Sequence, residues 1–196
     1  MTTLAGRRVL LRPLRPPDFA AWREVRRRNE KWLTPWEPAR SPGMPDVVES
    51  GEAFAMRCSA RERERQLGTG YGFGIFLDDR FCGEINLSSV QRGPFQSCYV
   101  GYWIDEAEAG HGYMPEAVVL VIRFAFDRLN LHRVQISIIP RNHRSRRVVE
   151  KLKLRDEGTA LRYLEINGVW EDHVRYAITA EEWAERRDEL IAEWLA

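Results

Sequence analysis

A short turn that contains two glycines carries the clearest chemical signal in this chain of 196 residues. Gly110 and Gly112 follow a strand-like apolar run and precede a strongly apolar segment, which predicts a helix over 115–129. Glycines let the backbone approach a phosphate closely, and the first N–H groups of a helix point at a bound anion with the positive end of the helix dipole behind them. The turn therefore predicts a ligand that carries phosphate groups.

Two other interpretations apply to this turn. A lone Gly-x-Gly is also typical of a plain strand–helix connection. A dinucleotide-binding fingerprint would need G-x-G-x-x-G at the opening of a parallel βαβ unit near the start of the chain. The position of its third glycine is occupied by Pro115, and the turn lies in the middle of the chain. The dinucleotide interpretation therefore fails.

Two carboxylates are candidates for acid–base chemistry or for substrate orientation. Glu84 interrupts an otherwise apolar strand segment, so it is either a general base or an outward-facing charge on a half-buried strand. Strand alternation places Asp172 on one face with Trp170, Val174 and Tyr176. Asp172 therefore either orients a substrate or holds a hairpin as a buried hydrogen-bonding acid.

The histidines and cysteines do not form a metal-site pattern. The spacing of the four histidines matches no zinc site. The three cysteines are odd in number and lack C-x-x-C spacing, which fits a reducing cytoplasm and argues against a disulfide framework. We therefore predict no metal.

The bulk properties favour one soluble domain. A chain of 196 residues can bury a substantial core, and we expect a single domain over 1–196. The formal net charge of +1 draws the chain neither to nucleic acid nor to a membrane surface. No apolar run approaches membrane-spanning length, and the N-terminal residues lack an apolar signal core. We expect a cytoplasmic protein with no direct nucleic-acid or membrane partner.

The elements that must position these residues follow from periodicity and turn residues. A helix opens at the prolines of 15–19, and 29–45 reads as an irregular loop. The other predicted helices are 46–66, 115–129, 142–152 and 181–195. The predicted strands are 8–14, 71–77, 81–90, 97–104, 133–139 and two strands that meet at Asn167-Gly168. The order βααβββαβαββα predicts an α/β protein of the α+β type, with a mixed, mostly antiparallel twisted sheet flanked by helices.

This order, with the glycine turn after the fourth predicted strand, resembles the GNAT superfamily of N-acetyltransferases. Within it the chain looks like the RimJ/RimL-type ribosomal-protein alanine N-acetyltransferases, and the resemblance covers nearly the whole chain. Its markers are Val-Leu-Leu-Arg-Pro-Leu at 9–14, Leu-Thr-Pro-Trp-Glu-Pro at 33–38, Val-Gly-Tyr-Trp-Ile at 100–104, Gly-His-Gly-Tyr-Met-Pro-Glu-Ala at 110–117, Asn-His-Arg-Ser-Arg-Arg-Val-Val-Glu-Lys-Leu at 142–152 and Asn-Gly-Val-Trp-Glu-Asp-His-Val-Arg-Tyr-Ala-Ile at 167–178.

The resemblance implies acetyl-CoA as co-substrate, with its pyrophosphate on the glycine turn. The family pattern Gln/Arg-x-x-Gly-x-Gly/Ala begins at Ala109 and ends at Met114, so two of its three named positions depart. Main-chain N–H groups hold the pyrophosphate, and any residue but proline supplies them. The expected cofactor-binding residues of the turn are Gly110, His111, Gly112, Tyr113 and Met114. The long polar side chain lost at Ala109 lowers affinity unless nearby arginines compensate.

The resemblance also assigns residues around the thioester. The backbone N–H groups of Trp103 and Ile104 would hold its carbonyl as an oxyanion hole. Asn142 would bond the pantetheine arm, although an asparagine there also fits a helix N-cap. Arg147 lies on the helix that follows and is expected to contact the cofactor. These four positions complete the expected acetyl-CoA site.

The resemblance leaves the proton donor and the acceptor site less complete. Many relatives place a tyrosine as general acid seven residues after the asparagine, where this chain has Val149. Ser145 or a water must then substitute, although Ser145 also fits a solvated helix position. In look-alikes the region of Trp32 and Trp36 lines the acceptor groove, and the alternative is a loop that plugs its own core. Lys153 stands where the family has glycine, so we expect a changed helix end.

The leading functional hypothesis is direct transfer of acetyl from acetyl-CoA to a primary amine. The acceptor is expected to be the N-terminal amine (Ala) of a ribosomal or other protein, and mild base assistance by Glu84 suffices because a terminal amine has a pKa near 8. Two alternatives stay open: acetylation of a small amine, such as an amino acid or antibiotic, and a catalytically idle acyl-CoA-binding module. The departures at Ala109, Met114 and Val149 motivate the last one. The chain is expected to be a monomer or a homodimer.

Overall fold

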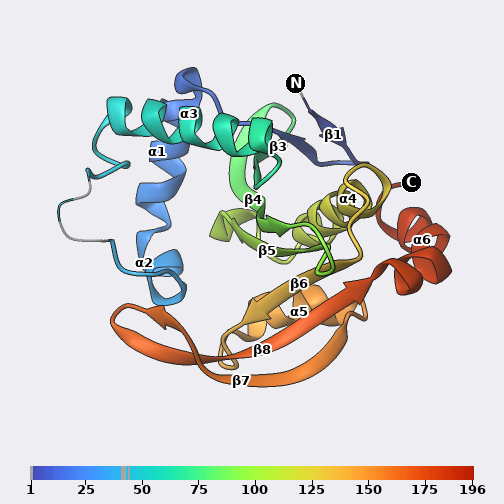
Figure 1. Cartoon of the computed structure of the whole chain (residues 1–196). Coiled ribbons are helices and arrows are strands. Elements are labelled where there is room, and N and C mark those ends of the chain that lie inside the picture. The colour runs from blue at the N-terminus through green and yellow to red at the C-terminus, as the bar shows by residue number, and fades with distance from the viewer. Residues whose placement is uncertain (1, 41–42, 44) are drawn as a thin grey trace.

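The computed structural model describes residues 2–40, 43 and 45–196 and forms one sheet of eight strands flanked by helices (Figure 1). The strands are β1 (Leu4–Ala5), β2 (Leu10–Arg12), β3 (Tyr71–Leu77), β4 (Arg80–Gln91), β5 (Ser97–Ile104), β6 (Arg133–Ile138), β7 (Arg155–Ile166) and β8 (Val169–Thr179). The helices are α1 (Phe19–Arg28), α2 (Glu30–Leu33), α3 (Gly51–Leu67), α4 (Tyr113–Asp127), α5 (His143–Lys151) and α6 (Ala180–Trp194). Short 3-10 turns, η1 (Pro16–Asp18), η2 (Thr34–Trp36) and η3 (Glu106–Glu108), connect them.

The sheet has the order β1-β2-β3-β4-β5-β6-β8-β7, and every neighbouring pair except β5–β6 is antiparallel. The prediction of a mixed, mostly antiparallel sheet is therefore confirmed. Both predicted hairpin turns are present, with left-handed Asp78 and Asp79 in one and Asn167 and Gly168 in the other. No helix within the described residues is long and apolar enough to cross a membrane.

Several predicted boundaries were wrong at the N-terminal end. The predicted order lacked the short β1 and α2, and part of the expected loop 29–45 is helical. Residues 41, 42 and 44 of that loop lie outside the described residues. The helix expected over 46–66 begins at Gly51, because the Ser50 side chain accepts a hydrogen bond from Ala53 N and caps the helix there.

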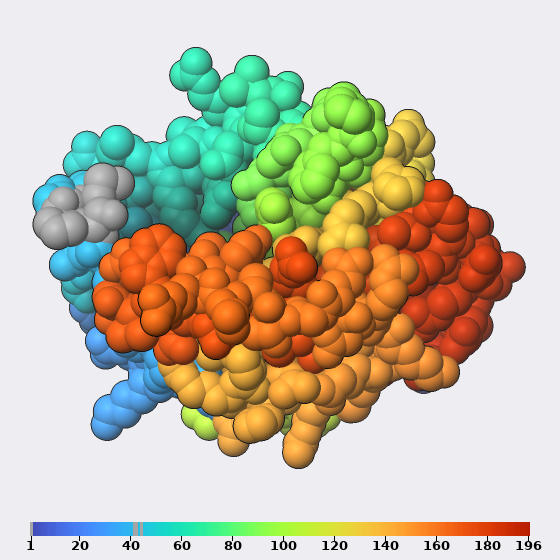
Figure 2. Space-filling model, turned by 60° about the horizontal axis from the view of Figure 1, so that its bottom comes forward, coloured from blue at the N-terminus to red at the C-terminus, as the bar shows by residue number. Residues whose placement is uncertain are grey.

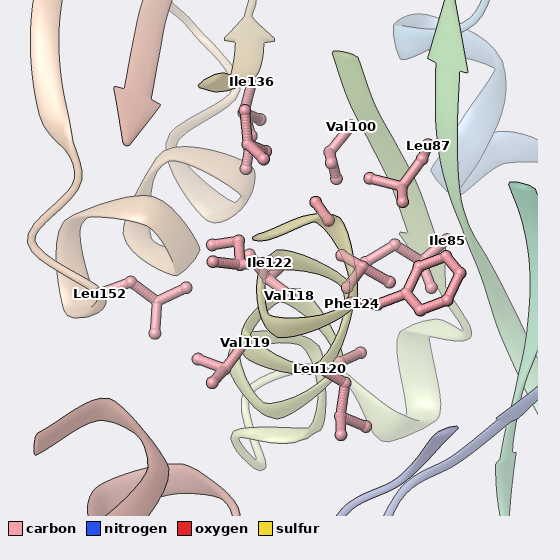
Figure 3. Close-up of a cluster of buried hydrophobic side chains, with 14 of the residues drawn as sticks. Ile85, Leu87, Val100, Val118, Val119, Leu120, Ile122, Phe124, Ile136 and Leu152 are labelled. Carbon is pink, nitrogen blue, oxygen red and sulfur yellow. The ribbon is translucent and has the colours of Figure 1, made fainter. Parts of the chain in front are cut away.

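The two faces of the sheet pack against different helices because strand side chains alternate. On β4, Ile85 and Leu87 join the main core with α4 (Figure 3), whereas Glu84 points to the opposite face and bonds Trp22 of α1. A smaller apolar cluster under α1 and α3 covers that opposite face. We call the two sides the α4 face and the α1 face.

Helix α4 is buried on nearly its whole circumference between the sheet, α5 and α6, which explains its strongly apolar sequence. It carries one fully buried carboxylate, Glu116. Its oxygens accept from Arg8 N at 2.6 Å, Val9 N at 2.9 Å and Arg8 Nε at 3.0 Å, so the charge is paired and hydrogen-bonded. This clasp ties the β1–β2 connection to the first turn of α4.

The end of α5 differs from the expectation. Lys153 adopts a left-handed conformation, with φ +50°, and its N–H donates to Glu150 O at 3.0 Å. Leu154 N donates to Val149 O at 3.0 Å, and Leu154 is buried. The helix therefore closes with the left-handed turn that a glycine would make, and the expected change of helix end was wrong.

Candidate active site

Strands β5 and β6 separate partway along their length. Their parallel register runs only from the pair Ser97–Arg133 to the pair Tyr99–Gln135. Residues 100–104 and 136–139 instead line a cavity of about 2140 Å³ that reaches the glycine turn on one side and the aromatic loop of 32–36 on the other. The opening between the two strands is the natural place for a ligand that must meet groups from both faces of the sheet.

The backbone of β5 presents alternate residues to this opening. Asp105 N donates to Cys82 O at 2.7 Å, and extending the register from that bond makes Glu84 and Trp103 a hydrogen-bonded pair. The N–H of Trp103 is therefore directed at β4. The direction of the N–H group alternates along a strand. The N–H groups of Tyr102 and Ile104, one residue to either side of Trp103, therefore face the opening. Ile104 thus fits the predicted oxyanion hole, whereas Tyr102 replaces Trp103 in it.

The glycine turn is braced from behind by the N-terminal segment. Gly110 and Gly112 have φ of +87° and +86°, a conformation that favours glycine, and both line the cavity. The His111 carbonyl accepts from Arg8 Nη1 at 3.0 Å, and Arg8 also binds Glu116 of α4. The first N–H groups of α4 have no partner inside the helix. These N–H groups belong to the helix start at Tyr113 and Met114, next to Gly112, and all three residues line the cavity, as the pyrophosphate prediction requires. The His111 side chain does not line the cavity.

Cations face the cavity from α5. Arg144, Arg147 and Lys151 are spaced three and four residues apart, so they share one face of the helix, and all three line the cavity. Within the described residues, no hydrogen bond engages the side chain of Arg147 or Lys151. These cations are placed to supply the positive charge that the side chain at Ala109 lacks.

Asn142 and Ser145 stand together at the start of α5. Asn142 Oδ1 accepts from Ser145 N at 3.1 Å, so the N-cap interpretation is confirmed, and both residues line the cavity. Ser145 Oγ lies 3.1 Å from the hydroxyl of Tyr102, which donates to Ser145 O at 3.1 Å. Burial raises the pKa of Tyr102, so the phenol stays protonated. Val149 is fully buried in the core.

Sequence reasoning missed Tyr102 because its role depends on a contact with α5. The available signal was the alternation of Val100, Tyr102 and Ile104 along β5, which places a single hydroxyl on the α4 face. The predicted catalytic Ser145 is thus joined by a second hydroxyl group at the same point of the opening.

Glu84 lies in the cavity wall on the α1 face and is not an outward-facing charge. Its Oε1 accepts from Trp22 Nε1 at 2.7 Å, and its Oε2 accepts from Arg57 Nη2 at 2.6 Å. The carboxylate is largely buried, with 14% of its side chain exposed. Both oxygens are therefore already engaged by donors.

The aromatic loop and the β7–β8 hairpin meet over the cavity. Asn167 Nδ2, at the hairpin turn, donates to Thr34 O at 2.7 Å, and Figure 2 shows the orange hairpin reaching the blue segment that holds α2. Trp32 Nε1 donates to Ile104 O at 3.0 Å. The guanidinium of Arg144 lies 4.4 Å from the ring centroid of Trp32, and that of Arg141 lies 5.0 Å from the ring of Trp36. Trp32 and Trp36 therefore line this cavity and do not plug a separate core, while their role toward an acceptor stays a prediction.

Asp172 does not belong to this site. It is not among the cavity residues, and its Oδ1 accepts from Arg162 N at 2.8 Å, at the bulge where the β7–β8 register shifts. Arg162 has φ of +47° there. Because Asp172 lies outside the cavity, the prediction of a substrate-orienting acid was wrong. The predicted role in holding the hairpin fits, although the carboxylate is partly exposed and not buried.

The acids that line the cavity are all close to arginines. Each lies within 4 Å of a guanidinium in the pairs Glu37–Arg26, Asp46–Arg40, Glu62–Arg65, Glu84–Arg57, Glu106–Arg144 and Glu108–Arg80. Cavity walls built in this way leave little free negative charge for a polycationic ligand. Among the described residues, no group of three or more histidine, cysteine, aspartate or glutamate side chains could hold a metal ion.

Comparison with known proteins defines the class. The model of the acetyltransferase (GNAT) domain matches residues 8–155. A probable N-acetyltransferase of Bacillus subtilis, YjcK, is 36% identical over 177 residues, which cover 89% of this chain and 96% of that protein. The [ribosomal protein uS5]-alanine N-acetyltransferase of Escherichia coli is 34% identical over 174 residues, covering 87% of this chain and 88% of the relative. The chain belongs to the GNAT acetyltransferase family and is an N-acetyltransferase.

The solved structures agree. RimJ of Mycobacterium smegmatis in complex with CoA-disulfide superposes with a TM-score of 0.89 at 33% identity, covering 98% of this chain and 94% of that one. The resemblance to RimJ/RimL-type enzymes and the fold it implied are therefore confirmed. The roles of individual residues stay predictions.

Proposed function

We propose that this enzyme transfers the acetyl group of acetyl-CoA to the N-terminal amine of a protein, with an alanine-terminated ribosomal protein as the acceptor. The extent of the cavity carries the proposal: it runs from the glycine turn to the loop of 32–36, where Asn167 Nδ2 bonds Thr34 O. The name of the Escherichia coli relative supports the acceptor class, and the CoA complex of the Mycobacterium smegmatis neighbour supports the co-substrate.

Acetyl-CoA would lie in the opening between β5 and β6. The backbone of the glycine turn would hold the pyrophosphate, with Arg147 and Lys151 facing it from α5. Asn142 would meet the pantetheine arm through its side-chain amide, because its Oδ1 is shared with Ser145 N. The N–H groups of Tyr102 and Ile104 would stabilise the oxyanion that forms on the thioester carbonyl.

The leaving group and the acceptor would sit on opposite faces of the opening. Ser145 Oγ, which donates to the Tyr102 hydroxyl in this structure, would turn its hydrogen to the departing thiolate and so substitute for the tyrosine that is replaced by Val149. The amine would enter from the α1 face, where the walls include Glu84, Trp32 and Trp36. A terminal amine with a pKa near 8 is partly neutral at physiological pH, so it needs less base assistance than a lysine side chain near 10.4.

The two alternative functions receive less support. A polycationic antibiotic would need free acids, whereas the acids of the cavity are close to arginines. The idle-module alternative rested on Ala109, Met114 and Val149; the cations of α5 and the Tyr102–Ser145 pair offer replacements for what those positions lack. We place the reaction in the cytoplasm and propose that the enzyme acts as a monomer or homodimer without nucleic acid or membrane.

A panel of amines tests this proposal. The protein would be incubated with acetyl-CoA and an alanine-terminated peptide, an amino-blocked peptide with an internal lysine, free amino acids or an aminoglycoside, with mass spectrometry as readout. Acetyl gain on the alanine peptide above all others is expected. No gain on any amine, despite acetyl-CoA binding by calorimetry, would contradict the proposed activity and favour the idle module. Absence of acetyl-CoA binding would contradict both.

A further inference from the structure

A buried histidine lines the cavity. Its contacts within the fold engage only one of its two ring nitrogens. His173 lies on β8 and is 3% exposed, yet it is one of the cavity residues. Its neighbours Val174 and Tyr176 belong to the main core, where Tyr176 bonds Arg146 of α5. Strand alternation therefore places Val174 on the α4 face and His173 on the α1 face, from which the acceptor amine would enter.

The hydrogen bonding of His173 defines which ring nitrogen is basic. Its Nδ1 lies 3.0 Å from the backbone oxygen of Glu171. A carbonyl oxygen only accepts, so Nδ1 carries the hydrogen and, in the neutral ring, Nε2 carries the lone pair. Within the described residues, Nε2 has no hydrogen-bond partner. The ring is held further by Tyr163, whose ring centroid lies 5.7 Å away in an edge-on arrangement.

The sheet register places His173 across the opening from the proposed oxyanion site. The β5–β6 pairing ends at Tyr99–Gln135, so Trp103 and Ile139 line the opening without pairing. Extending the β6–β8 register one step beyond Ile138–Val174 brings Ile139 level with His173. Trp103 is paired with Glu84 on β4. Glu84 and His173 therefore lie on opposite sides of the opening, His173 on the strand beyond β6, and both line the same cavity as Ile104.

The two groups differ in their capacity to take a proton. Each oxygen of Glu84 already accepts a hydrogen bond, one from Trp22 and one from Arg57, so a proton from the amine would compete with these donors. The free nitrogen of a neutral imidazole has no such competitor here.

We infer that His173 Nε2 is the general base that takes the proton from the attacking amine, an assignment that rests on the proposed function. The nitrogen–carbon bond forms as the carbon–sulfur bond breaks, and one amine proton goes to Nε2. The imidazolium releases that proton to water in the cavity, and the thiolate, hydrogen-bonded by Ser145, takes one from water and leaves as CoA thiol. Glu84 then orients the acceptor wall through Trp22 and Arg57.

Two substitutions at this position separate chemistry from structure. His173→Asn keeps an N–H donor for Glu171 O but has no basic nitrogen, and we expect kcat to fall about 100-fold with the KM for acetyl-CoA unchanged. His173→Ala should lose as much and regain at least about tenfold when imidazole is added, because the free base can enter the vacated space. The control is His132→Asn, which replaces an exposed histidine that pairs with Glu181. Its kcat should equal that of the unaltered enzyme, and added imidazole should not change it.

The outcomes are distinct. A His173→Asn enzyme within about threefold of the unaltered kcat would overturn the assignment, as would a folded, acetyl-CoA-binding His173→Ala enzyme that imidazole does not restore. Absence of acetyl transfer by the unaltered enzyme to any amine would instead contradict the proposed function itself, and the base assignment would fall with it.

Discussion

The hydroxyl of Tyr102 on β5 lies 3.1 Å from Oγ of Ser145 on α5, across the point where β5 and β6 separate. Tyr102 also donates to the backbone oxygen of Ser145, so the phenol holds both the side chain and the first turn of its helix. Under the proposed function, the thioester sulfur would lie beside this contact. It offers a hydroxyl pair in a chain whose usual tyrosine position is the buried Val149.

Removing the phenolic oxygen tests this contact. Tyr102→Phe keeps the ring but removes the oxygen that accepts from Ser145 Oγ and donates to Ser145 O, so the serine hydroxyl loses its fixed position. We expect a roughly tenfold lower kcat, which corresponds to about 1–1.5 kcal/mol. The KM for acetyl-CoA should change little. If Tyr102 acts through Ser145, the double variant with Ser145→Ala should be no slower than Ser145→Ala alone. Independent, additive losses in steady-state kinetics would contradict the pairing.

The two glycines of the phosphate turn form a matched pair. A side chain at either position would cost about 1 kcal/mol in backbone strain, because both residues have left-handed φ. A Cβ at Gly112 would also lie 3.2 Å from Arg8 Nη2 and 3.6 Å from Trp194, whereas one at Gly110 would meet nothing within 4 Å. We expect Gly112→Ala to weaken acetyl-CoA binding by about tenfold or more and Gly110→Ala to weaken it less. Calorimetric titration that finds both variants unaffected would contradict the backbone cradle.

Glu84→Gln distinguishes a base from a wall residue. The amide oxygen can still accept from Trp22 or Arg57, but the charge opposite Arg57 is lost. We expect kcat to fall by less than about tenfold, whereas loss of a general base costs about 100-fold or more. The comparison with His173→Asn under identical conditions is the control. A large loss in Glu84→Gln alongside an active His173→Asn would assign the base to Glu84.

The acid stability of the enzyme should depend on Asp105, which follows β5. Burial opposes its charge, but hydrogen bonds from Arg28, Asn29 and Ala107 N prevail and lower the pKa of this carboxyl below its usual 3.8. Because the folded pKa is the lower one, its stabilisation is complete above about pH 4 and disappears as pH falls through the folded pKa.

Replacing this carboxylate should show that dependence. Asp105→Asn leaves the Arg28 guanidinium without its buried partner, with only the exposed Glu24 beside it, so we expect a loss of about 1–3 kcal/mol in the free energy of unfolding at pH 7. The difference from the unaltered protein should shrink as the pH falls below about 4. Urea unfolding over this pH range measures it. A difference that stays constant down to pH 2 would rule out the Asp105 charge as its source.

Local sequence patterns predicted most of the fold. The apolar run expected to be helical over 115–129 forms α4, and the Asn167-Gly168 turn has the left-handed pair that its residue types favour. The glycine turn likewise lies where the strand–turn–helix pattern placed it. These features depend on residues that are neighbours in the chain, so a single sequence contains them.

The parts of the site that were missed depend on register and on distant contacts. Whether Trp103 or Tyr102 turns its N–H to the opening is decided by a one-residue parity, which only the pairing of β5 with β4 determines. The free nitrogen of His173 becomes visible only once Glu171 O is seen to occupy the other one. Asp172 was misassigned because a bulge in β7, absent from the alternation pattern, gave it a backbone donor.

The most direct measurement of the central claim is the position of the acetyl group on one peptide. A peptide with a free N-terminal alanine and an internal lysine would be incubated with the enzyme and acetyl-CoA, and tandem mass spectrometry would locate the product. We expect a single acetyl group on the α-amine, with the lysine unmodified. Acetylation of the lysine side chain, or of neither amine while acetyl-CoA binds, would contradict it.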